Sequence, residues 1–453
     1  MSERGVWRVA IVGAGAAGLT AAIAAAERIR REGTRRRTTP EVAVLDGAAR
    51  LGAKILVSGG GRCNVTNVTV VPEDFNGSRQ QIRKVLAAFS ARDAALWFRS
   101  MGVDLREEAG GKLFPATGRA RDVLGALLGR CRALGIEVRT RCRVHAINRV
   151  AAAQEGEGGA TDPPSLRVVH EAGETLAARV VLATGGSSLP RSGSDGEGFR
   201  IAAALGHSVI GPAPALVPLV LAEGMLHGSL SGVSLPAEML TRRDRRIIDR
   251  RTGDLLWTHF GVSGPVVLDA SRHWTTARAA GARVEITVSF LPGEDFESVQ
   301  RMLLRESSEG GARSCRRALA GRIPERLAEA LMLRAGIDRS RRIGDLRRDE
   351  RRNLARALVE LPLPIERDRG WSHAETTAGG VPLSEIDPRT MGSRKVPGLH
   401  LAGEILDCDG RVGGFNFQWA WSTGWIAGRG AAGATGRGAR GKGGRGAGGP
   451  GHD

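Results

Sequence analysis

The chain has 453 residues and a mass of 47.8 kDa, and 42% of its residues are hydrophobic and 25% charged. These values are ordinary for a globular protein and provide enough chain for two or three domains with hydrophobic cores. No uncharged apolar stretch is long enough to span a bilayer, and the N-terminus lacks the pattern of a secretory signal peptide. We therefore expect a cytoplasmic protein without membrane contact.

Five scattered cysteines without a Cys-x-x-Cys pair argue against a disulfide framework, a zinc site and a dithiol redox centre, and no metal site is expected. The net charge of +18 would suit nucleic acid, but eight tryptophans, ten phenylalanines and no tyrosine offer little for base stacking. We interpret the charge as arginine spread over a solvated surface and expect no stable nucleic-acid partner. Residues 429–453 form a basic, glycine-rich tail that is predicted to be disordered.

The first predicted element is a strand at residues 9–12, a continuous apolar run typical of strands buried on both faces. It leads into Gly13-Ala-Gly15-Ala-Ala-Gly18 and an alanine-rich helix starting near Ala16. In a dinucleotide site Gly13 makes the tight turn, Gly15 lets a pyrophosphate approach the backbone, and Gly18 lets helix pack on strand. The helix N-terminus supplies free N–H groups for the pyrophosphate. A plain glycine-rich turn is the structural alternative.

The same glycine spacing recurs at residues 428–433 and 436–441, but no strand precedes those copies, and we interpret them as chance matches. The second strand is predicted at residues 41–46. It ends in Asp46, whose carboxylate would accept hydrogen bonds from the ribose hydroxyls of an adenosine. An arginine-rich loop at residues 30–37 is interpreted as a solvated insertion, with recognition of a 2′-phosphate as the alternative.

Residues 52–67 hold the adjacent glycines Gly59, Gly60 and Gly61, followed by Arg62, Cys63 and Asn64. Glycines allow close approach to the backbone, and the polar side chains offer donors, which suits a polyanionic or heteroaromatic ligand. A surface loop built on Asx and Thr turns is the alternative. A neighbouring arginine can lower a thiol pKa, but we interpret Cys63 as a small packing residue beside a cofactor.

The middle of the chain alternates between helical and strand-like patterns. Helices are predicted at residues 80–101, 122–134 and 196–206. Short strands, interrupted by a polar loop at 151–164, are predicted to form a β-meander at residues 136–139, 143–147, 166–170 and 175–178. A buried strand at residues 178–182 then ends in the small-residue turn Thr184-Gly185-Gly186, where a strand wrapping a cofactor would end.

From residue 212 the chain becomes rich in proline and strand-like pieces, which predicts an inserted β-rich domain over residues 212–370. Its strands are predicted at residues 219–221, 246–248, 266–268 and 284–288. Residues 297–360 are predicted to be helical and are strongly basic. His259 is a candidate acid or base, and a hydrogen-bonded loop histidine is an equally good interpretation.

The last quarter returns to glycine-rich segments. We predict a Thr/Gly turn at residues 375–381 and a strand at 398–401 that leads into Gly403 and Glu404. Gly413-Gly414-Phe415-Asn416 then opens a helix at residues 417–428, whose N-terminus faces a ligand. Trp419 and Trp421 are interpreted as packing residues on that helix, with a ligand-facing role for one of them as the alternative.

Several of these segments carry a family likeness: GAGAAG, ILVSGGGRCNVTN, ATGG, WTHFGVSGP, ETTAGGV and GLHLAGEILDCDGRVGGFNFQWAWSTG. Together they resemble the bacterial two-dinucleotide-binding-domain flavoproteins of the aminoacetone oxidase / bile-acid reductase type over residues 8–428. GGGRCN and GGFNFQWAWSTG are the most specific stretches. The resemblance implies an α/β fold, in which a Rossmann-type FAD-binding domain with a β-meander comprises residues 1–211 and 371–428. A β-barrel-like and helical domain over residues 212–370 is inserted into it.

The resemblance also implies an extended FAD, with adenosine at Asp46, pyrophosphate at residues 13–18, and the flavin beside residues 61–64 and 413–416. Residues 403, 404 and 407 would take the ribityl and phosphate side, and the main chain of residue 144 would touch adenine. The predicted cofactor-binding residues are Gly13, Gly15, Ala16, Ala17, Gly18, Asp46, Lys54, Gly60, Gly61, Arg62, Cys63, Asn64, Val144, Thr184, Gly185, Gly403, Glu404, Asp407, Gly413, Gly414, Phe415 and Asn416.

The expected activity is hydride transfer between flavin N5 and a small organic substrate. A second credible nucleotide turn is missing from the sequence, so electrons would come from a transiently bound NAD(P)H or from the substrate itself. No side chain stands out as the catalytic acid or base. Two alternatives stay open: an FAD-dependent RNA-modifying enzyme, suggested by the charge and the basic helical insert, and a non-catalytic flavoprotein.

Overall fold

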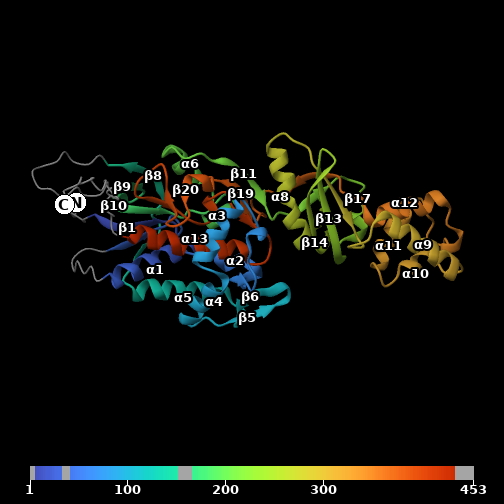
Figure 1. The fold of residues 1–453 in the computed structure, drawn as a ribbon, viewed down its shortest axis with the longest axis horizontal. Coiled ribbons are helices and arrows are strands. Elements are labelled where there is room, and N and C mark those ends of the chain that lie inside the picture. Colours follow the sequence, from blue (N-terminus) through green and yellow to red (C-terminus); the bar gives the residue numbers. More distant parts are fainter. Residues whose placement is uncertain (1–5, 33–40, 151–165, 434–453) are drawn as a thin grey trace, which may run out of the picture.

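The computed structural model describes residues 6–32, 41–150 and 166–433. Figure 1 shows an elongated molecule with two parts side by side along its longest axis. The main part holds a nine-stranded sheet with α1, α5 and α13, and the insert holds a seven-stranded sheet followed by helices α9 to α12 at the far end. Each part has its own hydrophobic core.

The main sheet has the strand order β20-β21-β22-β10-β1-β2-β7, with β8 and β9 attached through β10. β1 (Trp7–Val12) lies between β10 (Gly173–Leu182) and β2 (Val42–Leu45) and is parallel to both. The parallel run continues to β22 (Leu399–Leu401) on one side and β7 (Glu137–Arg139) on the other. Because β2 is completely buried, its sequence is a continuous apolar run rather than an alternating one, and residues 9–12 of β1 follow the same pattern.

Two helices from opposite ends of the sequence pack on each other at the centre of the main part. α1 (Ala16–Arg31) follows β1, and α13 (Phe415–Ala432) is the last described helix. A Cβ at Gly424 would lie 2.4 Å from the carbonyl oxygen of Ala17, and one at Gly428 would lie 2.0 Å from that of Ala21. The backbones therefore touch, which only glycine on α13 permits.

The other elements of the main part are short. They are α2 (Ala53–Gly61), β3 (Thr66–Asn67), η1 (Pro72–Asp74), β4 (Phe75–Asn76), α3 (Arg79–Ala88), α4 (Ala91–Ser100), β5 (Leu105–Glu108), η2 (Ala109–Gly111), β6 (Lys112–Pro115), α5 (Ala120–Ala133), β8 (Val144–Arg149), β9 (Leu166–His170), η3 (Pro190–Ser192), α6 (Glu197–Ala204), β11 (Ile210–Ala215), β19 (Thr376–Gly380), η5 (Leu383–Glu385), β20 (Ile386–Asp387), β21 (Gly392–Ser393), η6 (Gly403–Ile405) and β23 (Asp409–Gly410).

The insert is an antiparallel sheet in the order β17-β16-β13-β14-β15-β12-β18, and its core centres on Trp257 and Phe290. Its elements are β12 (Leu219–Leu221), α7 (His227–Leu230), β13 (Ser234–Arg243), β14 (Arg246–Thr258), β15 (Gly261–Ser263), α8 (Pro265–Ala279), β16 (Glu285–Ser289), α9 (Phe296–Gly310), α10 (Cys315–Leu319), α11 (Glu325–Arg334), η4 (Ile343–Asp345), α12 (Arg348–Val359), β17 (Leu361–Pro362) and β18 (Ile365–Asp368).

The α/β fold class is confirmed, but several predicted elements were wrong in type or extent. The single helix predicted at residues 80–101 is two helices, because Ser90 caps α4 and accepts a hydrogen bond from the N–H of Asp93. The strand predicted at 266–268 lies inside α8, whose first residue is Pro265 after Gly264. Proline at the first helical position starts a helix in spite of the valines that follow it.

Other differences concern strands that pair over long distances. The predicted turn at residues 375–381 contains β19, which pairs with β11. The two strands predicted at 175–178 and 178–182 are one strand, β10. β7 is a parallel member of the main sheet, so the meander comprises β8, β9 and β10 only. α13 continues to Ala432, and the rest of the predicted tail, the loop at 151–164 and most of the arginine-rich loop lie outside the described residues.

Among the described residues, none of the helices combines the length and the apolar character that crossing a membrane requires.

The backbone contact between α1 and α13 predicts a large difference between two alanine substitutions. Gly428→Ala places a methyl group against the carbonyl of Ala21 and should lower the free energy of unfolding by about 2 kcal/mol or more. Gly125→Ala, in the exposed part of α5 with no atom near the new Cβ, should raise it by up to about 1 kcal/mol. Urea unfolding of both variants measures the difference, and equal effects would contradict the assigned contact.

Candidate functional site

A cavity of about 490 Å³ opens at the carboxyl edge of the main sheet. Residues one or two positions after four neighbouring parallel strands line it: Gly13 after β1, Asp46 after β2, Thr184 after β10 and Gly403 after β22. Ligands of open α/β sheets bind at this edge, because the loops that follow parallel strands converge there. Among the described residues there is no cluster of side chains suited to a metal ion.

The first glycine turn has the geometry that a pyrophosphate needs. Gly13 has φ +101°, and a Cβ there would lie 2.4 Å from the carbonyl oxygen of Ala183. Gly15 lines the cavity, with open space where its Cβ would stand, and begins α1 as its N-terminal cap. A Cβ at Gly18 would lie 1.9 Å from the carbonyl oxygen of Gly13. The free N–H groups at the start of α1 thus face an open space suited to an anion.

Asp46 lies beside this turn. Its carboxylate accepts hydrogen bonds from the N–H groups of Ala14 (2.6 Å) and Ala48 (2.8 Å). Val144 and Arg143, from the start of β8, line the same end of the cavity, and Arg143 forms an ion pair with Asp195 at 2.5 Å. Each carboxylate oxygen of Asp46 keeps a lone pair for a ribose hydroxyl.

The triple-glycine stretch ends α2 in an unusual conformation. Gly59, Gly60 and Gly61 all have positive φ angles (55°, 68° and 83°), and Cys63 follows with φ 62°. Gly60 has open space at its Cβ position and lines the cavity. Glu108 forms an ion pair with Arg62 at 2.9 Å, and the guanidinium lies 4.2 Å from the ring centroid of Phe114. The arginine is therefore held at the cavity wall.

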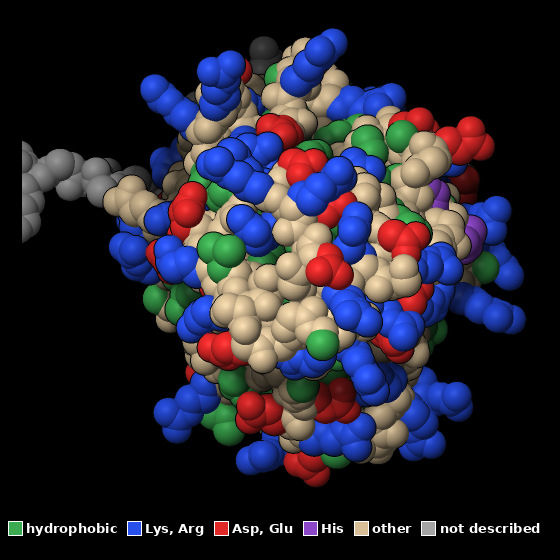
Figure 2. Space-filling view, turned by 90° about the vertical axis from the view of Figure 1, so that its right-hand side faces the viewer, with side chains coloured by type: hydrophobic (Ala, Val, Ile, Leu, Met, Phe, Trp, Pro, Cys, Tyr) green, Lys and Arg blue, Asp and Glu red, His purple; other side chains and the backbone are tan. Residues whose placement is uncertain are grey.

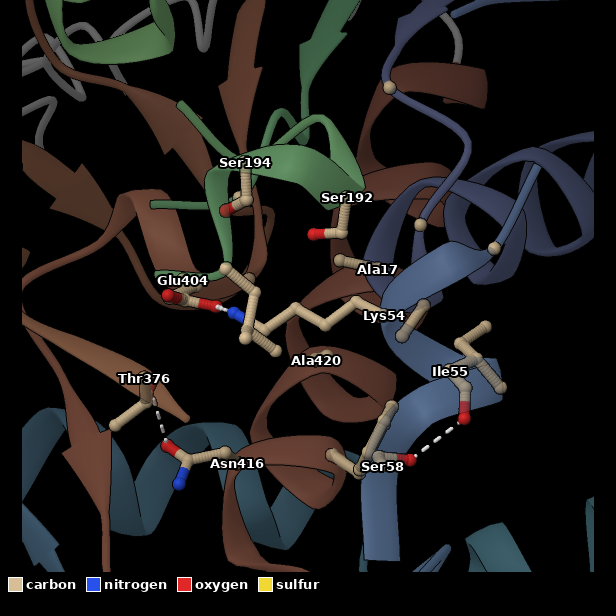
Figure 3. A pocket seen from close by; sticks show the side chains of 18 of the residues that line it. Ala17, Lys54, Ile55, Ser58, Ser192, Ser194, Thr376, Glu404, Asn416 and Ala420 are labelled. Atoms are coloured by element: carbon tan, nitrogen blue, oxygen red, sulfur yellow. Dashed lines mark hydrogen bonds and ion pairs between the residues drawn. The ribbon is translucent and has the colours of Figure 1, made fainter. Parts of the chain in front are cut away.

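A second glycine turn faces the first at the other end of the cavity. Gly413 and Gly414 have φ angles of 139° and 94°, and a Cβ at Gly414 would lie 2.6 Å from the carbonyl oxygen of Thr66. Asn416, in the first turn of α13, accepts a hydrogen bond from Thr376 at 3.4 Å. Figure 3 shows this pair below the centre of the cavity, with Lys54 and Glu404 above it.

Lys54 and Glu404 form a half-buried polar group with two residues, Ser188 and Thr377, that were absent from the predicted site. Lys54 pairs with Glu404 and donates to the hydroxyl of Ser188 at 2.5 Å. The other carboxylate oxygen of Glu404 accepts from Ser188 (2.7 Å) and Thr377 (2.8 Å). This group joins α2, the loop after β10, β19 and η6, and it sets the width of the cavity between them.

Four buried polar atoms on the cavity wall have no hydrogen-bond partner within the described part of the chain: the amide oxygen of Asn64 and the hydroxyls of Thr184, Ser192 and Ser194. A buried polar atom without a partner costs free energy, so these atoms fit a polar ligand that supplies the missing bonds. They follow the path from the second glycine turn to the Asp46 end, as an extended dinucleotide requires. Ser192 and Ser194 were missed in the sequence, although the small polar run after Gly186 was a signal for them.

Most of the predicted cofactor-binding residues line the cavity, and five do not: Gly18, Gly61, Cys63, Asp407 and Phe415. Cys63 is buried, and burial raises the pKa of its thiol to about 12, which suits a packing residue. Phe415 is buried against Phe75. The direct contacts of all the predicted residues with a cofactor stay predictions.

Trp421 is buried in the core and donates to the carbonyl of Val65, while Trp419 lines the cavity and donates to the carbonyl of Gly403. His259 is exposed, packs on Phe260 and does not line the cavity.

Helix α8 of the insert contacts the backbone that precedes the second glycine turn. Asp269 accepts the N–H of Val412 at 2.7 Å, and Arg272 forms an ion pair with the buried Asp409 at 2.8 Å. Burial raises the pKa of Asp269 to about 6, against the opposing effect of the Val412 N–H. These bonds fix the backbone that leads into residues 413–416.

The substitution Gly15→Ala tests contact with the cofactor separately from the stability of the fold. The new methyl group would stand in the open space of the first turn and should weaken FAD binding at least about tenfold, since overlap in a packed site costs about 1–3 kcal/mol. The weaker helix cap should lower the stability of the apoprotein by at most about 1 kcal/mol. Quenching of flavin fluorescence measures the affinity. Gly211→Ala, outside the cavity with equal space, is the control, and unchanged affinity in Gly15→Ala would contradict the assignment.

Comparison with known proteins identifies the family of this chain. Residues 7–430 match the family described as HI0933-like protein Rossmann domain. The 3-dehydro-bile acid delta(4,6)-reductase of Clostridium scindens is 32% identical over 427 residues, covering 94% of this chain and 99% of that protein. The ribosomal RNA dihydrouridine synthase of Escherichia coli is 32% identical over 419 residues (92% and 95%), and that of Haemophilus influenzae is 30% identical over 417 residues (91% and 95%). The resemblance to the bile-acid reductase type is confirmed: the chain belongs to the HI0933-like family and is an FAD-dependent oxidoreductase.

Proposed function

We propose that this protein is a cytoplasmic reductase that adds hydrogen across a carbon–carbon double bond conjugated with a carbonyl group in a small organic substrate, with NAD(P)H as the electron donor. Residues 1–211 and 371–428 hold the cofactor, and residues 212–370 form an inserted domain. The two separate hydrophobic cores support this division.

One observation carries the substrate part of the proposal: residues that belong to neither glycine turn also line the cavity, and we call this part of the lining the extension. Lys112 and Phe114 on β6, Leu216 after β11 and Glu375 before β19 line this extension. These four side chains come from three separate segments and combine apolar surface with one cationic and one acidic group. A flat, partly polar organic molecule fits such a lining.

The relatives' names point to the same type of reaction. A delta(4,6)-reductase is named for reduction at carbon–carbon double bonds, and a dihydrouridine synthase for the hydrogenation of uridine. In both cases a hydride and a proton add across a ring double bond. FAD, when bound, supplies hydride chemistry at N5.

The residues of this chain would bind the cofactor and orient the substrate. The N–H groups of residues 14–17 would hold the pyrophosphate, and Asp46 the ribose. The backbone of residues 413–416 and the free amide oxygen of Asn64 would face the flavin. Lys112 is a cavity-lining ammonium without an ion pair in the described chain, and it would attract the carbonyl oxygen of the substrate. Polarising that carbonyl makes the double bond a better hydride acceptor.

The test separates the two halves of the reaction. The purified protein should show oxidised-flavin absorption, release FAD on denaturation and be bleached by NADH or NADPH without oxygen. A conjugated 3-keto-4,6-diene steroid should then restore the oxidised spectrum and gain two mass units per reduced double bond. The saturated ketone, with the same skeleton, should leave the flavin reduced. Flavin that no nicotinamide or substrate reduces would instead support a non-catalytic flavoprotein.

A second candidate function, reduction of uridine in RNA, is favoured by the charge of the insert. The helices at the end of the molecule expose arginines that have no ion pair among the described residues: Arg301, Arg305, Arg317, Arg322, Arg334, Arg348 and Arg352. Figure 2 shows Lys and Arg side chains spread over this end, with acidic side chains between them. Such a surface attracts a phosphate backbone.

The two functions predict different acceptors and different responses to salt. An RNA-modifying enzyme should be reoxidised by a ribosomal RNA transcript and not by the steroid, and its RNA affinity should fall steeply with salt. In that case Arg348→Ser together with Arg352→Ser should weaken RNA binding and leave bleaching by NAD(P)H unchanged. Reoxidation by the steroid, with no RNA binding at low salt, excludes this second function.

A further inference from the structure

Five carboxyl groups line the cavity, and four of them are engaged by the protein. Asp46 accepts two backbone N–H groups, Asp195 pairs with Arg143, Glu197 pairs with Arg200, and Glu404 pairs with Lys54. Over residues 6–32, 41–150 and 166–433, the carboxyl group of Glu375 has no hydrogen bond and no ion pair. Its side chain is exposed to the cavity. A free carboxyl group at this position is available to a substrate.

The main chain of Glu375 is held on both sides. Its N–H donates to the carbonyl of Leu216 at 3.2 Å, and its own carbonyl oxygen lies 3.4 Å from the hydroxyl of Ser188, whose proton goes to the closer Glu404. Leu216 is buried and has φ 52°, an unusual backbone conformation for a leucine, which turns its carbonyl toward Glu375. The carboxyl group is therefore carried on a fixed backbone.

This backbone lies beside the second glycine turn. Thr376, the next residue, donates to Asn416 in the first turn of α13. Glu375 thus reaches the cavity where the flavin is expected and where the extension lined by Lys112, Phe114 and Leu216 begins. An acid at this place can reach a substrate that lies against the flavin.

The electrostatic surroundings suit a group that gives up and regains a proton. Although Glu375 is exposed to the cavity, the surrounding protein removes its carboxyl group from bulk solvent and so raises the pKa of Glu375, and the charges of Lys54 and Lys112 oppose this effect. The other charged residues around this end are paired: Glu404 with Lys54, Arg62 with Glu108, and Arg411 with Asp74. The carboxyl group of Glu375 therefore stays protonated to a higher pH than that of a glutamic acid in bulk solvent. After proton transfer, the ammonium groups of Lys54 and Lys112 stabilise the carboxylate.

We propose that Glu375 is the catalytic acid that protonates the α-carbon of the conjugated substrate. The inference rests on the proposed function. FAD, when bound, would supply a hydride to the β-carbon, with NAD(P)H as the reductant, and the π electrons of the double bond would then form the new C–H bond at the α-carbon. The O–H bond of Glu375 breaks, its proton adds to that carbon, and the carboxylate takes a new proton from solvent. Two electrons and two hydrogens enter the substrate, and NAD(P)⁺ leaves.

The test compares Glu375→Gln with the wild-type holoenzyme in separate half-reactions. Bleaching by NAD(P)H should change less than about twofold. Reoxidation by the dienone steroid should slow by about 10²- to 10⁴-fold, the usual contribution of a general acid. In the wild type reoxidation should also slow as the pH rises and the carboxyl group loses its proton, and this dependence should vanish in Glu375→Gln. Glu375→Asp should recover part of the rate. Glu366→Gln, an exposed carboxyl on β18, is the matched control and should behave as the wild type.

A second readout does not depend on turnover. Infrared difference spectra of the wild-type protein against Glu375→Gln should show a protonated carboxyl C=O band that disappears as the pH rises. Wild-type reoxidation rates in Glu375→Gln, or the absence of this band, would overturn the assignment. If the wild type itself is not reoxidised by any conjugated ketone, the proposed function fails first, and that result is seen before any variant is compared.

Discussion

The contact between α1 and α13 is the constraint on which the site depends. Backbone touches backbone where Gly424 and Gly428 meet the carbonyls of Ala17 and Ala21. Each helix carries a glycine turn at its N-terminus, and the contact places both turns on one cavity. A side chain at either glycine would separate the helices and move the two turns apart. Thr423 adds a hydrogen bond to the N–H of Gly403, which ties the end of β22 to the same helix pair.

Helix α8 of the insert contacts the backbone just before the second glycine turn. Asp409 is buried and pairs with Arg272 of α8, and Asp269 holds the N–H of Val412. Breaking one partner of a buried ion pair leaves an uncompensated charge, which is costly. The backbone before the second glycine turn therefore depends on α8, so a change in the packing of the insert is felt at the cavity.

How much of this was visible in the sequence depended on the range of the interactions. The first strand, turn and helix were predictable because apolar runs and glycine spacing are local signals. The strand β19 was predicted as a turn because its partner, β11, lies more than 160 residues away and its glycines reduce strand propensity. The apolar run at 266–268 favoured a strand in the prediction, but Pro265 at the first helical position starts a helix.

The residues of the site, too, were predictable only where a local signal marked them. Glycines were found because positive φ angles and close backbone contacts favour glycine, and its spacing is a local signal. Lys54 and Glu404 were found from their motifs, but their ion pair was not, since 350 residues separate them. Ser192, Ser194 and Glu375 were missed because nothing local marks a serine or a glutamate as facing a cavity. Their roles depend on the loop after β10 and on the pairing of β11 with β19.

The pairing of the first and last helices also has a consequence during synthesis. A ribosome releases α1 hundreds of residues before α13, so the face of α1 that α13 covers must stay unpaired while the insert is made. The cofactor cavity cannot exist before residues 413–432 have left the exit tunnel, although its first glycine turn is made at once. FAD is thus a ligand of the nearly finished chain, and a nascent chain halted before residue 413 should emerge colourless.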